Sequence, residues 1–282
     1  MAGRILIIGA LVILSSSCRF DVDMSGFVYT PVPVKERFAL SMQWIDDHPP
    51  REIYVEGDQY MILAGSDAHV GGTDNLSAFI GSAVERGAAM IAVAGDIVTG
   101  WEDDYAIAAA ELEGAGSIPV CVVPGNHDLY FNGWNSFYDY FGASAFTFTV
   151  HTTDTSDLYI FLDTGGGTLG GDQLQWLKAL LAEQRGDHRY ACVITHNNFF
   201  RNRFTLSTNP LNEELLVLLD LFAENRIDLV IQGHDHKRNE ALFGNTTYIT
   251  LDAMQDVNDN ASFLELKVNT DDGISHSFVT IN

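Results

Sequence analysis

Short apolar runs alternate with amphipathic segments along most of this chain. Apolar runs rich in β-branched residues and bounded by turn residues indicate buried strands, and apolar positions three or four apart indicate helices. The sequence predicts strands at 60–64, 89–94, 118–123, 145–150, 158–162, 190–195, 229–232, 247–251, 263–268 and 276–281. It predicts helices at 35–47, 75–86, 103–113, 135–141, 173–184 and 213–225.

The order of these elements predicts the class of fold. Strands alternate with helices as far as residue 232, and the rest of the chain is rich in strands. This order is typical of a layered α/β fold. Because there is no internal repeat and no low-complexity linker, we expect one domain.

The first residues have the pattern of an export signal. Arg4 precedes an apolar run at 5–14, which is followed by three serines and Cys18. A run of this length is typical of a secretory signal and is too short to cross a membrane as a helix. We expect residues 1–17 to be a signal peptide and the protein to be exported. A buried N-terminal strand or helix is the alternative.

Cys18 suggests where an exported protein would be held. A cysteine directly after small residues resembles a bacterial lipoprotein cleavage site, although Ser15 stands where leucine is usual. We expect a protein of the bacterial periplasm or cell envelope, with a membrane tether if Cys18 is lipidated. The other two cysteines, Cys121 and Cys192, lie in apolar runs and are expected to be buried free thiols.

The chain is strongly acidic. It has 38 acidic against 15 basic residues and a net charge of −23. This charge repels nucleic acid, which we do not expect as a partner. A small anionic substrate would need local positive charge, and bound cations can supply it. We assign most of these carboxylates to a solvated surface that keeps the protein soluble.

Potential metal ligands follow five of the predicted strands. They are Asp67, His69, Asp96, Asn126, His196, His234 and His236. Ligand sites lie outside the carboxyl ends of strands in α/β sheets, so we expect these side chains to gather there. Carboxylate, imidazole and amide oxygen suit Mn, Fe, Zn or Ni. Seven candidates are enough for two cations that share one carboxylate.

In this order, the motifs D-x-H, G-D, G-N-H-D, H and G-H-x-H resemble those of the calcineurin-like metallophosphoesterases, from Asp67 to His236. The resemblance implies a layered β-sandwich flanked by helices over residues 60–282, with a β-rich C-terminus and residues 18–59 as an N-terminal extension packed on it. It implies two divalent or trivalent metal ions. It also implies hydrolysis of a small anionic phosphate monoester or diester by a hydroxide that bridges these ions.

The resemblance also implies roles for single residues. The first metal would be held by Asp67, His69 and His236 and the second by Asn126, His196 and His234, with Asp96 bridging the two. His127 would face the leaving group, paired with Asp128, and Asn126 would help to stabilise charge on the phosphoryl oxygens.

Two segments offer candidate substrate contacts. Arg201 and Arg203 stand among aromatic residues, and arginine can bind a phosphate through two hydrogen bonds. A solvated surface loop is the alternative. After the central motif, Tyr130, Phe131 and Trp134 either line a pocket or belong to the core; we assign Tyr130 to the pocket and Phe131 to the core.

Two other interpretations compete with an enzyme. A single histidine or aspartate at a strand end is more often a cap or a core polar group, but eight such residues in this order leave little room for that interpretation. The second is a non-catalytic envelope scaffold or binding protein that keeps the fold and the metals. The complete ligand set with His127 favours the enzyme, and bound metal without turnover would favour the scaffold.

Overall fold

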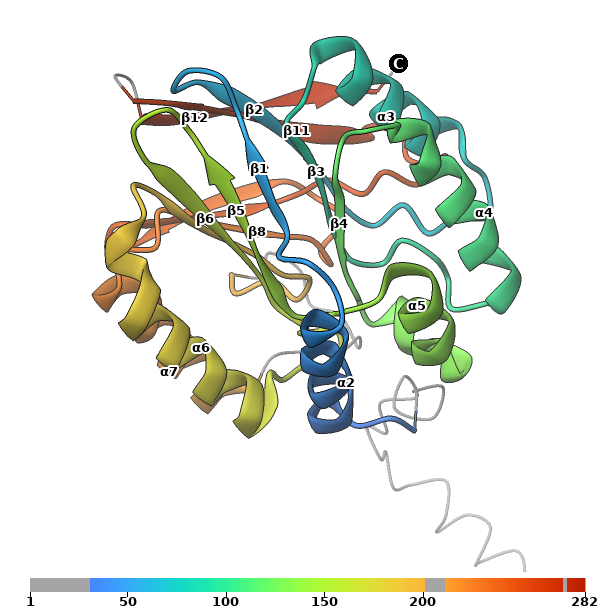
Figure 1. The fold of residues 1–282 in the computed structure, drawn as a ribbon. Coiled ribbons are helices and arrows are strands. Elements are labelled where there is room, and N and C mark those ends of the chain that lie inside the picture. The colour runs from blue at the N-terminus through green and yellow to red at the C-terminus, as the bar shows by residue number, and fades with distance from the viewer. Residues whose placement is uncertain (1–30, 201–210, 271–272, 282) are drawn as a thin grey trace, which may run out of the picture.

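Two β-sheets face each other in the computed structural model, which describes residues 31–200, 211–270 and 273–281 (Figure 1). The seven-stranded sheet has the order β1 (Glu52–Tyr54), β5 (Phe146–His151), β6 (Ser156–Phe161), β7 (Ala191–Ile194), β8 (Leu229–Gln232), β10 (Thr246–Thr250) and β9 (Asn239–Phe243). The five-stranded sheet has the order β12 (Gly273–Thr280), β11 (Ser262–Asn269), β2 (Tyr60–Gly65), β3 (Met90–Ala94) and β4 (Val120–Val123).

Helices cover the outer faces of both sheets (Figure 1). The helices are α2 (Val34–Asp46), α3 (Asp74–Arg86), α4 (Glu102–Leu112), α5 (Trp134–Phe141), α6 (Gly170–Gln184) and α7 (Asn212–Glu224). The described residues also form three short 3-10 helices, η2 (Glu113–Ala115), η3 (His127–Asn132) and η4 (Arg185–Asp187). Helices α3, α4 and α5 lie against the five-stranded sheet, and α6 and α7 lie against the seven-stranded sheet. The predicted layered β-sandwich with flanking helices and a β-rich C-terminus is therefore confirmed.

The main core lies between the two sheets. It joins side chains of β2 and β3, such as Ile62 and Ala92, to side chains of β6 and β7, such as Phe161 and Cys192. Strands β2, β3 and β4 are parallel to one another, as are β6, β7 and β8. Strands buried on both faces require nearly continuous apolar runs, which explains why these strands are so readable in the sequence.

Helix α2 is joined to the sandwich by a buried polar cluster. The guanidinium of Arg37 donates from Nε to Oδ2 of Asp163 at 2.8 Å and from Nη2 to Oδ1 at 3.0 Å, and both residues are fully buried. The remaining members are Ser41, Ser144 and Gln173. We call these five residues the Arg37 cluster.

The predicted elements agree with the structure to within three residues at each end. Strands β1 and β9 were not predicted. β1 has only three residues, and β9 is an edge strand with an exposed outer side, so neither has an apolar run. Cys121 and Cys192 are buried free thiols, as predicted. Among the described residues, no helix is long and apolar enough to cross a membrane.

Candidate metal centre

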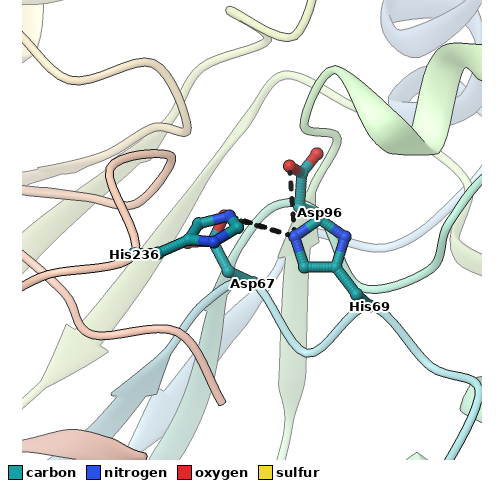
Figure 2. A group of neighbouring side chains, drawn as sticks. All are labelled: Asp67, His69, Asp96 and His236. Carbon is teal, nitrogen blue, oxygen red and sulfur yellow. Dashed lines mark hydrogen bonds and ion pairs between the residues drawn. The ribbon is translucent and has the colours of Figure 1, made fainter. Parts of the chain in front are cut away.

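Four side chains from three loops meet beyond the carboxyl ends of β2, β3 and β8. Asp67, His69, Asp96 and His236 place one potential ligand atom each within 4.8 Å of one another. Figure 2 shows these side chains pointing toward one another. Nε2 of His236 lies 3.2 Å from Oδ1 of Asp67, and Nε2 of His69 lies 3.6 Å from Oδ2 of Asp96. Both carboxylates are buried.

A second group lies beside the first and shares Asp96 with it. Asp96, His196 and His234 again place potential ligand atoms within 4.8 Å of one another. Nε2 of His196 lies 3.3 Å from Oδ2 of Asp96, 3.2 Å from Nδ1 of His234 and 3.3 Å from Oδ1 of Asn126. The seven predicted ligands therefore come together in the two expected groups, with Asp96 common to both.

The backbone of these loops is strained. Five of the seven residues have a positive φ, namely Asp67 (55°), His69 (43°), Asp96 (50°), His234 (74°) and His236 (56°). Residues other than glycine rarely adopt this conformation, and strained residues of this kind cluster at active and ligand-binding sites. Glycine provides the necessary space, because a Cβ on Gly125 would lie 2.1 Å from Oδ1 of Asp96. The fold therefore accepts a local cost to bring the ligand atoms together.

The donor atoms fit metal ions. Oδ1 of Asp67 is buried, and no described residue donates a well-aligned hydrogen bond to it. Nε2 of His69 faces Nε2 of His236 at 3.2 Å, an arrangement that needs a proton or a cation between the two nitrogens. Nδ1 of His196 lies 2.8 Å from the carbonyl oxygen of Ala94, which leaves Nε2 free to bind a metal.

The charges in the centre depend on one another. Burial acts to lower the pKa of His196, but the carboxylate of Asp96 raises this pKa to about 9. Burial acts to raise the pKa of Asp67, but the imidazoles of His236 and His69 hold it well below its ordinary value. Because a metal binds the neutral imidazole, His196 must release a proton when a cation takes this position.

His127 lies at the edge of the centre. Its ring is 4.5 Å from the ring of His69, and its backbone N–H donates to Oδ1 of Asp96 at 2.7 Å. Burial lowers the pKa of His127, so the imidazole is neutral at pH 7 and keeps one N–H donor. This position suits the predicted contact with a leaving group.

Asp128 does not pair with His127, contrary to our prediction. Its two carboxylate oxygens accept the backbone N–H groups of Val98 at 3.0 Å and Gly125 at 2.8 Å. Burial, together with the nearby charge of Asp96, raises the pKa of Asp128 to about 7. Asp128 therefore holds the loops after β3 and β4 together, a task that places its carboxylate away from the imidazole.

Of the three aromatic residues after the central motif, Phe131 differs from our prediction. The hydroxyl of Tyr130 accepts a hydrogen bond from Nδ2 of Asn126 at 3.0 Å, which places Tyr130 beside the centre. Trp134 is buried in the core. Phe131 is 49% exposed, so its assignment to the core is wrong. Its φ of 53° interrupts the helical turn and directs the side chain outward.

Two supporting residues were missed by sequence analysis. Oγ of Ser66 donates to Oδ2 of Asp67 at 2.7 Å. Oγ1 of Thr164 accepts the backbone N–H groups of His196 at 3.2 Å and Asn197 at 2.9 Å. Thr164 follows β6 at its carboxyl end, as the ligands follow their own strands, and that position was the available signal. The predicted residues Cys18, Arg201 and Arg203 lie outside the described residues.

A sequence model of one protein family matches this chain. The model is described as calcineurin-like phosphoesterase, and it matches residues 60–238, the stretch that contains every predicted ligand. The chain belongs to the calcineurin-like phosphoesterase family. The family and the two His/Asp groups together make it a metal-dependent phosphoesterase.

Solved structures share the fold at low sequence identity. A dimetal phosphatase from Danio rerio has a TM-score of 0.62 and 15% identity, covering 79% of this chain and 99% of that one. GAP50, the anchor in the inner membrane complex of Plasmodium, has a TM-score of 0.60 and 14% identity. The match covers 79% of this chain and 85% of that one. The purple acid phosphatase PPD1 from yellow lupin seeds has a TM-score of 0.60 and 10% identity, and the match covers 79% of this chain and 52% of that one. No curated protein sequence matches this chain.

Proposed function

We propose that this calcineurin-like phosphoesterase hydrolyses a small phosphate monoester or diester at a centre of two metal ions. The observation that carries the proposal is the pair of ligand groups with Asp96 in common. Asp67, His69 and His236 would hold one ion, and Asn126, His196 and His234 the other. Mn, Fe, Zn and Ni all suit these donors.

The two cations, when bound, supply an activated water nucleophile and neutralise charge on the phosphoryl oxygens. The protein supplies position and proton control. Asp96 fixes the spacing of the two ligand groups, because it belongs to both. The amide of Asn126, oriented by Tyr130, stabilises charge on a phosphoryl oxygen. The N–H of His127 donates to the leaving ester oxygen as the bond to phosphorus breaks.

The substrate reaches this centre against the charge of the whole protein. With a net charge of −23, attraction of an anion depends on the cations and on local arginines. We propose Arg201 and Arg203 as contacts for the leaving group, because they follow His196 closely in the sequence. Unchanged kcat/KM for every ester in Arg201→Ala would remove this assignment.

We also propose that the protein acts in the bacterial cell envelope. The basic and apolar residues 1–17 support export, and Cys18 after three serines supports a lipid tether. Labelled palmitate should enter the wild-type protein and be absent from Cys18→Ser, which should then be found in the soluble periplasmic fraction. Labelling of Cys18→Ser would contradict the tether.

A metal-binding scaffold without turnover is the second candidate. It is favoured by the structural likeness to GAP50, which is described as an anchor rather than as an enzyme. The test is hydrolysis of bis(p-nitrophenyl) phosphate and p-nitrophenyl phosphate by the Mn²⁺-loaded protein, with Asp96→Asn as the control. Activity that is lost in the control supports the enzyme, and the preferred ester shows whether it acts on diesters or monoesters. Two bound metals without turnover, also with Fe²⁺ and Zn²⁺, would support the scaffold.

A further inference from the structure

Two large aromatic rings are stacked on the surface near the metal centre. The ring centroids of Trp101 and Phe131 are 4.3 Å apart with an angle of 19° between the planes. Trp101 is 58% exposed and Phe131 is 49% exposed. Exposed apolar surface of this kind, when it is contiguous, marks a place where something binds.

The backbone holds this pair in place at a cost. Phe131 has a φ of 53° and Asn132 a φ of 67°, a conformation that is strained for a bulky residue such as phenylalanine. The loop that carries Trp101 lies tightly against the same segment, because a Cβ on Gly100 would lie 2.7 Å from the carbonyl oxygen of His127. The strain turns Phe131 out of the core and onto Trp101.

The pair is connected to the leaving-group side of the centre. The ring of Tyr130 lies 4.6 Å from the ring of His127 and 6.3 Å from the ring of Phe131. Tyr130 also accepts the hydrogen bond of Asn126, a proposed metal ligand. Tyr130 therefore links the pair to His127, which we place on the leaving-group side of the centre.

A hollow with polar walls opens beside the two rings. It has a volume of about 350 Å³, and its polar lining includes Glu102, Asn135, Ser136 and Asp139. This volume is within the range of small-molecule sites. Carboxylates accept hydrogen bonds from amino groups, and amides both donate and accept. A flat ring with polar edges, as in a nucleobase, uses the stacked rings and these walls together.

We propose that the Trp101–Phe131 pair and this hollow bind the base of a nucleotide ester, whose phosphate then lies at the metal centre with the nucleoside as leaving group. The inference rests on the proposed function and names its substrate class. A single nucleotide is favoured over nucleic acid, because Glu102, Asp103 and Asp104 at the start of α4 would repel a longer polyanion.

The test compares esters that differ only in the leaving group. The substrates are adenosine 5′-phosphate and glycerol 3-phosphate, each also as its methyl diester, with the Mn²⁺-loaded full protein. The variants are Trp101→Ala and Phe131→Gly, since glycine tolerates the positive φ and removes only the ring. The matched control is Tyr54→Ala, because Tyr54 is 76% exposed and stacks on His151 at the edge strand β1 of the other sheet.

We expect wild-type protein to prefer the adenosine ester. The preference is measured as the ratio of kcat/KM for the two leaving groups. Loss of either ring should lower this ratio about tenfold to a hundredfold, as expected for one stacked base. Tyr54→Ala should leave the ratio unchanged. An equal loss of kcat/KM for both esters would show that the rings act only in folding, and no loss for either ester would show that they bind no base. Either result overturns the inference.

Calorimetry with adenosine 5′-phosphate separates this inference from the proposed function. If bis(p-nitrophenyl) phosphate is hydrolysed but the adenosine esters are neither bound nor hydrolysed, the nucleotide site is refuted and the phosphoesterase stands. If adenosine 5′-phosphate binds in a manner that depends on Trp101 but no ester is hydrolysed, the nucleotide site stands and the proposed function fails.

Discussion

Two clusters of buried charge in this molecule are built in opposite ways. In the Arg37 cluster, both oxygens of Asp163 meet the guanidinium of Arg37, and every buried polar side-chain atom has a partner. In the metal centre, Oδ1 of Asp67 lacks an aligned donor, and imidazole nitrogens face each other across 3.2 Å. The Arg37 cluster is fully buried, whereas the side chain of His236 in the metal centre is 31% exposed.

The difference shows how a binding site can be told from a structural ion pair. A buried charge is costly unless it is paired, and in the Arg37 cluster the chain supplies the partner itself. In the metal centre the chain supplies only ligands, in a backbone with five positive φ angles. Protonated imidazoles such as that of His196 offset the carboxylate charge, and cations that displace these protons can take their place.

Removal of the carboxylate that the two ligand groups share should have the largest effect on the metal centre. Asp96→Asn keeps the size of the side chain but removes the charge common to both ligand groups. We expect turnover to fall roughly a thousandfold, because transition-state charge is stabilised through this residue. Metal analysis of the purified variant should show fewer than two ions per chain, and two retained ions would contradict the bridging role.

The matching change in the other cluster should affect stability instead. Arg37→Met leaves Asp163 charged and unpaired in the interior, which costs about 3–5 kcal/mol of the free energy of unfolding. Chemical denaturation measures this loss. The double variant Arg37→Met/Asp163→Asn should recover much of it, because the unpaired charge is gone. Loss of bound metal from folded Arg37→Met, as in Asp96→Asn, would contradict the separate roles of the two clusters.

His127 tests whether chemistry and metal binding are separate within the centre. Its imidazole lies against His69 but belongs to neither ligand group. We expect His127→Ala to lower turnover about a hundredfold, as for loss of a hydrogen-bond donor to the leaving oxygen, while both metals stay bound. The expected loss should be smaller for esters whose leaving group has a low pKa. Release of a metal from His127→Ala would refute its assignment to the leaving group.

Thr164 connects the two clusters, because it adjoins Asp163 of the Arg37 cluster and supports His196 of the metal centre. Thr164→Val keeps the shape and removes the acceptor for the backbone N–H groups of His196 and Asn197. We expect about a tenfold loss of metal affinity, the usual scale for a residue that orients a ligand. Metal titrations of the two variants Thr164→Val and Thr168→Val measure this loss of affinity. Thr168→Val is the control, because the hydroxyl of Thr168 bonds to Glu214 instead.

The ligands could be predicted because strand and loop patterns are local. Each ligand follows an apolar strand within a few residues, and parallel strands end together in such folds. The Arg37 cluster could not be predicted in this way. Its central ion pair joins residues 126 positions apart, and nothing near Arg37 in the sequence points to Asp163.

The errors around the centre have a similar origin. Asp128 stands next to His127 in the sequence, but the approach of Val98 and Gly125 decides where its carboxylate points. Phe131 looks like a core residue, and only its positive φ turns it to the surface. Side-chain partners and strained backbone depend on contacts between distant segments, which hydrophobic patterning does not encode.

We propose that two cations replace the imidazole protons that offset the carboxylate charge of the centre, and that these cations enable hydrolysis. The most direct measurement is a titration of metal-free protein with Mn²⁺, following bound metal and hydrolysis of bis(p-nitrophenyl) phosphate in the same samples. We predict binding of two ions per chain, with turnover rising as the second ion binds. Full turnover by metal-free protein, or saturation of binding and turnover at one ion, would contradict the claim.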